Sequence, residues 1–325
     1  MKAILCRRYG LPELVTCEEV EKPAPASGEV LIRVRAASLN PLDWHLKRGT
    51  PLIFRLMTGL RAPKDPRVGV DLAGEVEAAG NGVTQFKPGD AVFGGCKGGA
   101  FAEYVCTSES QVVLKPASLT FEQAAAAPVA AITALQGLRD KGRVEPGQKV
   151  LINGAAGGVG TFAVQMAKWM GAQVTGVCSS RNAELVRSLG ADHVIDYARE
   201  DFTRSGERYD LIFDLVAGHS LGACRRALTP QGTLLIAGVL SGKWSGFLRS
   251  LPLAPILSKF GKQRLLVFGA KRSKKDMETI GELMAAGKLR AVIEECHPLG
   301  ETADAIRHLE EKRARGKLVI IPGRH

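Results

Sequence analysis

The 325-residue chain is 45% hydrophobic, carries a formal charge of +11, and has seven scattered cysteines, none of them in a C-x-x-C pair. This is enough for two domains with buried cores, and it argues against a membrane span, a disulfide framework and a cysteine zinc cluster. The N-terminus lacks a signal-peptide pattern, so the cytoplasm is expected, while the charge suits nucleic acid, anionic lipid or a phosphorylated cofactor.

The first third of the chain predicts a β-rich, barrel-like module. Short runs rich in Val, Ile, Phe and Ala are separated by Gly, Pro and Asp, the pattern of strands joined by turns. The predicted strands are KAILCRRY (2–9), EVLIRVRAASL (29–39), GEVEAAG (74–80), DAVFGG (90–95) and FAEYVCTS (101–108).

The pattern becomes helical at Thr120. Thr120 is followed three residues later by Gln123, which is a capping-box pattern, and an alanine-rich stretch comes next. Pro128 lies within this stretch, and a proline kinks or divides a helix. We therefore expect a capped helix that is broken at Pro128.

From residue 149 onward, strands and helices alternate. Continuous apolar strands between helices predict a parallel sheet covered on both faces. One helix is expected to end at a C-cap glycine, Gly190, and two more helices and a last strand are expected between 276 and 322. The predicted strands of the parallel sheet are KVLIN (149–153), QVTGV (173–177), HVIDY (193–197), DLIFDL (210–215), TLLIAGV (233–239) and RLLVFGA (264–270).

A glycine-rich turn joins the first of these strands to a helix. The pattern A-x-G-x-x-G resembles the G-x-G-x-x-G of dinucleotide-binding proteins, with a glycine that permits close approach of a pyrophosphate and one that permits close helix packing. The helix N-terminus supplies N–H donors and a positive dipole. The predicted cofactor-binding residues of the turn are Ala156, Gly157, Gly158, Val159 and Gly160.

The residues after the second strand predict which cofactor is bound. An NAD enzyme usually places an acid on the ribose 2′-hydroxyl about twenty residues past the glycines. This chain has Ser179, Ser180 and Arg181 there instead, and hydroxyls with a guanidinium suit a 2′-phosphate. We expect NADPH, unless the serines merely cap the next helix and Arg181 faces water.

Over almost its whole length the chain resembles the medium-chain dehydrogenase/reductase superfamily, and within it the zinc-free quinone oxidoreductase (zeta-crystallin-like) group. The resemblance implies a GroES-like catalytic domain from residues 1–124 and 271–325, a Rossmann domain from 125–270, and a homodimer. The segments that carry it are EVLIRVRAASLNPLDWHLKRG (29–49), VGVDLAGEVEAAGNGVTQFKPGDAVFG (68–94), GAFAEYV (99–105), INGAAGGVG (152–160), LGADHVIDY (189–197) and ARGKLVIIP (314–322).

The chain departs from the zinc alcohol dehydrogenases of that superfamily at the zinc ligands. The matching positions hold Asn40, Val70 and about Val129, which cannot replace a thiolate or an imidazole as ligands. We therefore expect no metal. The hydride acceptor must then be electrophilic by itself, as a quinone or an α,β-unsaturated carbonyl is.

The resemblance also assigns roles to single residues. It implies that Asn40, Asp43 and Trp44 line the active cleft and that Thr133 lies beside the nicotinamide. Cofactor contacts are implied for Tyr197 at the 2′-phosphate end, for Gly238 and Phe268 at the nicotinamide half, and for the basic residue Lys317.

Each assignment has a structural alternative. Asn40 and Asp43 flank Pro41 and are also typical of a turn. Asp43 is a proton-donor candidate, but water is the other source. Trp44 is as compatible with packing as with a substrate wall. Thr133 is also compatible with a plain helix residue, Tyr197 with a surface tyrosine, and Lys317 with a solvated cation.

Two segments, 51–64 and 243–264, are both apolar and basic. We expect them to cover a lipophilic substrate pocket; contact with a membrane surface, or ordinary packing, are the alternatives. Two other functions also stay open. One is metal-free reduction of aldehydes or ketones, and the other is a non-catalytic NADPH-binding, RNA-binding or regulatory protein, although no RNP-type aromatic motif is present.

Overall fold

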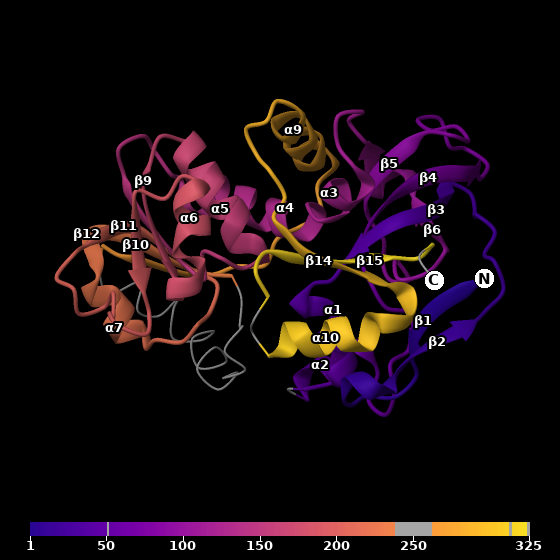
Figure 1. Ribbon diagram of the computed structural model, residues 1–325, viewed down its shortest axis with the longest axis horizontal. Coiled ribbons are helices and arrows are strands. Elements are labelled where there is room, and N and C mark those ends of the chain that lie inside the picture. Colours follow the sequence, from indigo (N-terminus) through magenta and orange to yellow (C-terminus); the bar gives the residue numbers. More distant parts are fainter. Residues whose placement is uncertain (51, 238–261, 312–313, 324–325) are drawn as a thin grey trace. The chain divides into compact units, whose positions relative to one another are not determined.

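The computed structural model describes residues 1–50, 52–237, 262–311 and 314–323. The chain forms two compact units, unit 1 from Met1–Ala130 with Arg272–His325, and unit 2 from Ala131–Lys271 (Figure 1). Unit 1 therefore combines both ends of the chain, and unit 2 is the continuous middle. The expected domain boundaries, 124/125 and 270/271, lie close to these unit boundaries.

Unit 1 is built on a seven-stranded sheet. Its strands run in the order β14-β15-β3-β4-β5-β7, and β6 pairs with β3; a separate antiparallel pair is formed by β1 and β2. The strands are β1 (Lys2–Cys6), β2 (Val15–Glu19), β3 (Glu29–Ser38), β4 (Asp71–Ala79), β5 (Ala91–Gly95), β6 (Tyr104–Ser108), β7 (Val112–Leu114), β14 (Ile293–Pro298) and β15 (Lys317–Ile321).

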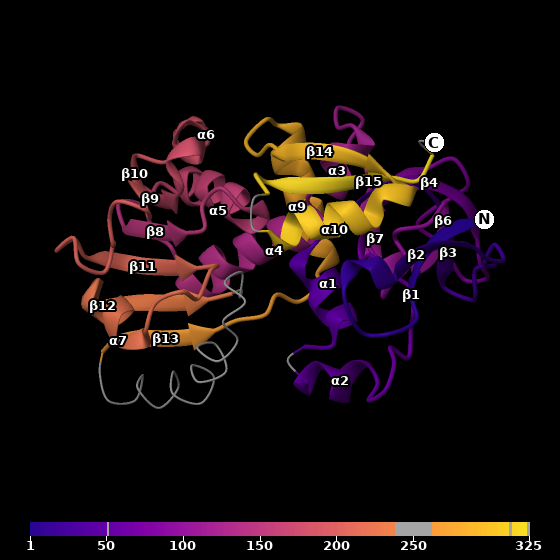
Figure 2. The same ribbon diagram turned by 60° about the horizontal axis from the view of Figure 1, so that its bottom comes forward.

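Short helices complete unit 1. They are α1 (Pro41–Arg48), α2 (Ile53–Thr58), α3 (Phe121–Ala125), α9 (Lys274–Ala285) and α10 (Thr302–Glu310), with 3-10 turns η1 (Pro12–Leu14), η2 (Glu109–Gln111) and η5 (Leu299–Glu301). Helix α10 packs along β14 and β15, as Figure 2 shows. Fully buried residues such as Ile32, Leu72 and Phe101 form the core, so the predicted β-rich module with its own core is confirmed.

The break predicted near Pro128 is confirmed. Gln123 N donates to Thr120 Oγ1 at 3.2 Å, and Thr120 N donates to Gln123 Oε1 at 3.0 Å, which completes the capping box of α3. Helix α3 ends at Ala125, and α4 (Pro128–Gln136) begins at the proline, followed by the π-helical turn η3 (Gly137–Gly142).

Unit 2 is a six-stranded parallel sheet in the order β10-β9-β8-β11-β12-β13. Numbered within the unit, this is the order 3-2-1-4-5-6 of the Rossmann fold, so the predicted doubly wound domain is confirmed. The strands are β8 (Lys149–Asn153), β9 (Gln173–Cys178), β10 (His193–Asp196), β11 (Tyr209–Asp214), β12 (Leu228–Ile236) and β13 (Arg264–Val267).

The helices of unit 2 are α5 (Gly158–Trp169), α6 (Ala183–Ser188) and α7 (Leu221–Arg226), with the 3-10 turn η4 (Ser180–Asn182). Helix α5 packs on β8 and β9, and α7 packs on β12. Gly190 takes a φ of +107° just after α6, which confirms the predicted glycine stop. The sheet holds the carboxyl ends of β8, β9, β10 and β11 at one edge, where a parallel α/β domain binds ligands.

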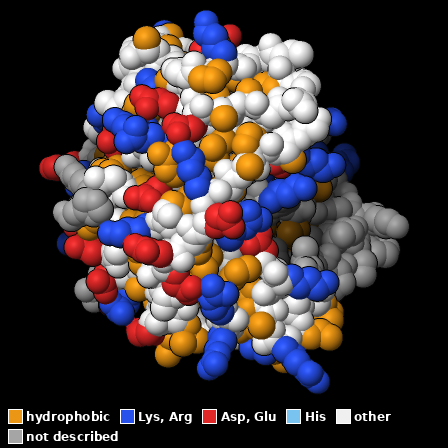
Figure 3. Space-filling model, turned by 90° about the vertical axis from the view of Figure 1, so that its right-hand side faces the viewer, with side chains coloured by type: hydrophobic (Ala, Val, Ile, Leu, Met, Phe, Trp, Pro, Cys, Tyr) orange, Lys and Arg blue, Asp and Glu red, His pale blue; other side chains and the backbone are white. Residues whose placement is uncertain are grey.

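Charge is mixed rather than segregated on the face of the molecule in Figure 3, where Lys and Arg side chains lie among Asp and Glu. Unit 1 also carries surface ion pairs such as Arg7–Glu18 and Lys22–Glu77. Within the described part of the chain, no helix is both long enough and apolar enough to cross a bilayer.

Candidate functional site

The glycine turn of unit 2 has the shape that a pyrophosphate site requires. Gly154 follows β8 with a φ of +91°, and α5 begins at Gly158 with no side chain capping its N-terminus. The first N–H groups of a helix have no acceptor within the helix, and its dipole adds positive charge there. The turn therefore offers donors to an anion.

The tight approach of helix and turn depends on Gly160. A Cβ at this residue would lie 2.1 Å from the carbonyl oxygen of Gly154 and 2.8 Å from Ala155, both backbone. A Cβ at Gly157 would only reach an ordinary contact, 3.4 Å from the same oxygen. The protein itself thus requires glycine at position 160, whereas Gly157 leaves space above the turn, as a dinucleotide site needs.

Asn153 and Asp214, which the sequence analysis missed, join the ends of β8 and β11. Asn153 Nδ2 donates to Asp214 Oδ1 at 2.8 Å, and the N–H groups of Val216 and Ala217 donate to the same oxygen at 3.0 Å. Both side chains are buried. The strand order reverses between β8 and β11, so this contact fixes the switch point. A polar residue ending an apolar run is the signal that could have found it.

The expected 2′-phosphate residues lie at the ends of two paired strands. Ser179 and η4 follow β9 directly, and Tyr197 follows β10. Tyr197 N donates to the carbonyl oxygen of Cys178 at 3.2 Å, so the backbone of Tyr197 lies beside Ser179, and its side chain is 64% exposed. Arg181 is exposed in η4. The structure thus brings Ser179, Ser180, Arg181 and Tyr197 to one corner of the sheet.

One acid lies at this corner, on the neighbouring strand. Asp196 pairs in register with Cys178. Its Oδ1 accepts from Ala198 N at 3.1 Å, and its Oδ2 lies 3.6 Å from Arg199 Nε. Burial, with a contribution from this carboxylate, raises the pKa of the Cys178 thiol to about 11, so Cys178 is an unreactive thiol.

The residues expected at the nicotinamide half are only partly described. Thr133 is 7% exposed on α4, and Phe268 N donates to Ile236 O at 2.9 Å, which prolongs the β12–β13 pairing. Gln136 bonds the backbone of Lys271 through both ends of its amide, at 2.8 and 3.0 Å. Gly238 and most of the segment 243–264 lie outside the described residues.

Unit 1 contains a buried polar cluster around the start of α1. Asn40 is the N-cap, and its N–H donates to Asp43 Oδ2 at 2.9 Å. Asn40 Nδ2 donates to Asp71 Oδ2 at 2.9 Å, while Lys317 Nζ donates to Asn40 Oδ1 at 2.6 Å and to Leu39 O at 2.9 Å. Asn40, Asp43 and Lys317 are therefore brought together, and Asp71 is a residue that the sequence analysis missed.

Burial dominates the electrostatics of this cluster. Asn40, Asp43, Asp71 and Lys317 are 3%, 4%, 1% and 3% exposed. Desolvation, with repulsion from Asp71, raises the pKa of Asp43 to about 7. Desolvation also raises the pKa of Asp71, against the opposing effect of Lys317, and lowers the pKa of Lys317. Asp43 Oδ1 has no hydrogen-bond partner.

Trp44 and the segment 51–64 differ in exposure. Trp44 is 3% exposed and packs in the core of unit 1, with the Arg48 guanidinium 5.4 Å from its ring centroid. In the segment 51–64, Leu52 and Leu56 of the α2 region are 68% and 71% exposed. A covering role for this segment stays a prediction.

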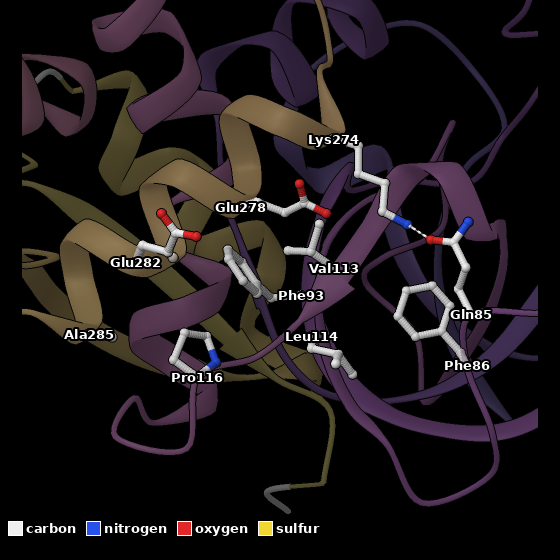
Figure 4. A pocket seen from close by; sticks show the side chains of 11 residues that line it. Gln85, Phe86, Phe93, Val113, Leu114, Pro116, Lys274, Glu278, Glu282 and Ala285 are labelled. Carbon is white, nitrogen blue, oxygen red and sulfur yellow. Dashed lines mark hydrogen bonds between the residues drawn. The ribbon is translucent and has the colours of Figure 1, made fainter.

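Unit 1 also has an open cavity of about 380 Å³ between α9 and the strands β5 and β7 (Figure 4). Phe86, Phe93 and Leu114 supply apolar surface, and Lys274 on its rim donates a hydrogen bond to Gln85 Oε1. None of the predicted site residues lines this cavity. It is therefore separate from the candidate catalytic residues.

Two families match the chain. Residues 26–117 match the family described as Alcohol dehydrogenase GroES-like domain, and residues 189–320 match the family described as Zinc-binding dehydrogenase.

Relatives and solved structures match over nearly the whole chain. A chloroplast envelope quinone oxidoreductase homolog of Arabidopsis thaliana is 33% identical over 94% of this chain and 93% of its own length. The trans-enoyl reductase pgmF of Aspergillus terreus is 32% identical over 90% of this chain and 86% of its own. The structure of a quinone oxidoreductase from Coxiella burnetii has a TM-score of 0.87 and 30% identity, and 99% of each chain is covered.

The zinc that the second family description implies does not fit the side chains of this chain. At the positions that the family resemblance gives to the zinc ligands stand Asn40, Val70 and about Val129, and the described residues contain no group of three His, Cys, Asp or Glu side chains that could hold a metal ion. Asp71 instead has the ammonium of Lys317 at 4.0 Å. A lysine thus supplies the positive charge beside this buried carboxyl.

Proposed function

This chain belongs to the quinone oxidoreductase group of the medium-chain dehydrogenase/reductase superfamily, and we propose that it reduces a quinone or an α,β-unsaturated carbonyl with NADPH, without a metal. The observation that carries the proposal is the corner of unit 2 where an uncapped helix N-terminus lies at the same sheet edge as Ser179, Ser180, Arg181 and Tyr197.

The residues of unit 2 suit NADPH. Bound NADPH supplies a hydride from its nicotinamide ring. The first turn of α5, with Ala156, Gly157, Gly158 and Val159, would receive the pyrophosphate, and Gly160 keeps that turn close to β8. The two serine hydroxyls, Arg181 and the exposed Tyr197 would hold the 2′-phosphate, and Thr133 and Phe268 would lie toward the nicotinamide.

The side chains at the positions that match the zinc ligands indicate the class of acceptor. Because no side chains suited to zinc are present at the matching positions, the carbonyl of a simple alcohol–ketone pair would lack its usual polarising group. A quinone or an enone is electrophilic without one, and relatives named as a quinone oxidoreductase and as an enoyl reductase agree with this class. Asn40, Asp43 and Trp44 are proposed on the acceptor side.

The test follows the loss of NADPH absorbance at 340 nm with an ortho-quinone, a para-quinone, a 2-alkenal and a saturated aldehyde, with NADH in parallel. We expect turnover of a quinone or the alkenal, a preference for NADPH, and no effect of a chelator. Turnover of the saturated aldehyde alone would favour metal-free carbonyl reduction. Tight NADPH binding with no turnover of any acceptor would contradict the enzyme.

We also propose that the protein is a cytoplasmic homodimer. The size of the particle in solution, measured by light scattering after size-exclusion chromatography, tests the dimer. A particle of the 34.7 kDa chain mass would contradict it.

A further inference from the structure

Three ionisable side chains meet in the interior of unit 1, from three separate elements. Asp43 comes from α1, Asp71 from β4 and Lys317 from β15, and each is at least nine-tenths buried. Burying a charge is costly unless it is paired, so two acids and one base cannot all be charged here without a penalty. The contacts show which acid takes the charge.

Asp71 is the acid that is prepared for a negative charge. Its carboxylate accepts from Asn40 Nδ2 at 2.9 Å and from Val129 N at 3.2 Å, and Ser38 Oγ lies at 3.3 Å. Lys317 Nζ lies 4.0 Å from Asp71 Oδ2. It also donates to Asn40 Oδ1, so the Asn40 amide links the lysine to the Asp71 carboxylate. Asp71 and Lys317 thus neutralise each other through Asn40.

Asp43 is the acid that is left over. Its Oδ2 accepts the Asn40 N–H, which fixes the side chain, but its Oδ1 has no partner. Of the buried side-chain nitrogen and oxygen atoms in the described ranges, only this atom and His297 Nε2 lack one. A buried carboxyl oxygen without a partner among the protein atoms suits a proton that is kept for a later acceptor.

We propose that Asp71 and Lys317 are positioning residues with opposite effects on Asp43, in which the Asp71 charge, together with burial, keeps a proton on Asp43 Oδ1 and the Lys317 charge limits how tightly that proton is held, and that Asp43 delivers this proton to the acceptor after hydride transfer. The inference rests on the proposed function for its second half only. The family resemblance implies that Lys317 contacts the cofactor. In this proposal Lys317 acts on Asp43 and Asn40 instead.

The chemistry balances with the cofactor already proposed. The acceptor gains two electrons and one hydrogen as hydride from NADPH, which becomes NADP⁺, and the product is an enolate or a hydroquinone anion. The Asp43 O–H bond then breaks, its proton bonds to that anion, and Asp43 is left as a carboxylate. Water returns the proton before the next cycle.

The other ionisable groups on α1, on α2 and directly after β5 have partners of their own or are neutral. Lys47 of α1 donates to the carbonyl oxygen of Asp65 at 2.5 Å, and its pKa is lowered by burial. The Cys96 thiol, after β5, is neutral because burial raises its pKa to about 12. Arg48 pairs with Glu310 of α10, and Arg55 of α2 donates to Gly49 O. Burial first, and then the charges of Asp71 and Lys317, therefore set the pKa of Asp43, which is raised to about 7.

The first experiment needs no turnover. Infrared difference spectroscopy across a pH titration detects a protonated carboxyl group, and Asp43→Asn identifies its band. We expect a band in the wild type that titrates near pH 7 and is absent in Asp43→Asn. No such band at pH 6 would overturn the proposal, even if Asp71→Asn or Lys317→Met failed to fold.

The neighbours provide the sharper test, because they act with opposite signs. Removing the Asp71 charge in Asp71→Asn lowers the midpoint of Asp43, and removing the Lys317 charge in Lys317→Met raises it, each by about one pH unit. Lys317→Arg stays near the wild type, and so does the control Lys22→Met, whose lysine pairs with Glu77 at the surface. Shifts of the same sign in the two variants would refute the positioning role.

Activity tests the second half. Asp43→Asn should lower kcat about 100-fold, with the dissociation constant of NADPH unchanged. An unchanged kcat in Asp43→Asn would refute Asp43 as the proton donor. If the wild type binds NADPH and shows the titrating band but reduces no quinone or enone, the proposed function fails while the protonation of Asp43 stands.

Discussion

The substitution Gly160→Ala tests whether the turn after β8 is shaped as the structure shows. The new Cβ would lie 2.1 Å from Gly154 O and 2.8 Å from two backbone atoms of Ala155, so the backbone must move. Overpacking of this kind costs about 1–3 kcal/mol, occasionally more. Alanine gains at most about 1 kcal/mol over glycine in a helix. We therefore expect a net loss of up to about 2 kcal/mol in the free energy of unfolding.

The same shift should weaken cofactor binding, because the displaced turn carries the proposed phosphate donors. Loss of one hydrogen bond to a charged group costs about 1.5 kcal/mol, or roughly tenfold in Kd. The assays are urea unfolding followed by circular dichroism and NADPH titration by calorimetry.

Gly222→Ala is the matched control. Gly222 lies in α7 of the same unit, a methyl group added there would meet no atom within 4 Å apart from its chain neighbours and the nearby backbone of its own helix, and its backbone does not need a positive φ. This variant should gain up to about 1 kcal/mol and bind NADPH as the wild type does. A Gly160→Ala protein as stable as Gly222→Ala, with an unchanged Kd for NADPH, would refute the reasoning.

Three further predictions follow from other contacts. Arg181→Ala should raise the Kd for NADPH about 10- to 100-fold in calorimetry and leave the Kd for NADH unchanged, because a hydrogen bond to a charged group contributes about 1.5–3 kcal/mol. The control Arg204→Ala, which removes an exposed partner of Asp201, should change neither Kd. Because the pKa of Asp43 is raised from 3.8 to about 7, the free energy of unfolding of the wild type should fall as the pH rises from about 4 to 7. In urea unfolding, the stability of Asp43→Asn relative to the wild type should therefore rise over that range and stay constant above it. A stability difference that does not change with pH would contradict this. Thr120→Ala should lower the free energy of unfolding by about 1 kcal/mol, because it removes the cap of α3, and Thr120→Ser should retain most of that stability. Equal losses of stability in the two variants would speak against the cap.

The sheets could be predicted where the apolar runs were continuous. The central strands β8 and β11 of unit 2 are buried on both faces over most of their length, so their sequences are largely apolar, and each was expected within one residue of its place. Strand β12 begins at Leu228, five residues before its expected start, in a stretch that is partly polar and exposed. Strands β2 and β14 were missed because their sequences, VTCEE and IEECHP, are largely polar and partly exposed. Strand β7 was missed although its sequence, VVL, is apolar, because it is only three residues long. Edge positions do not impose a hydrophobic pattern.

The buried cluster of unit 1 shows where reading the sequence fails. Lys317 in the ARGKLVIIP segment was expected to contact a cofactor or water, yet its ammonium is 3% exposed and bonds Asn40. Its partners, Asn40 and Asp71, lie more than two hundred residues earlier in the chain, and no local pattern links them. By contrast, Asn40 and Asp43 are three residues apart in one helix cap, and that spacing was visible.

The most direct test of the proposed reaction follows the hydride itself. An enone is reduced with NADPH that carries deuterium at C4, prepared separately on each face of the nicotinamide, and the product is analysed by NMR and mass spectrometry. We expect one deuterium at the β-carbon of the product from one of the two labelled cofactors, while the α-carbon takes its hydrogen from water-exchangeable protons. A product without deuterium from either cofactor, or NADPH consumption without enone or quinone reduction, would contradict hydride transfer to this class of acceptor.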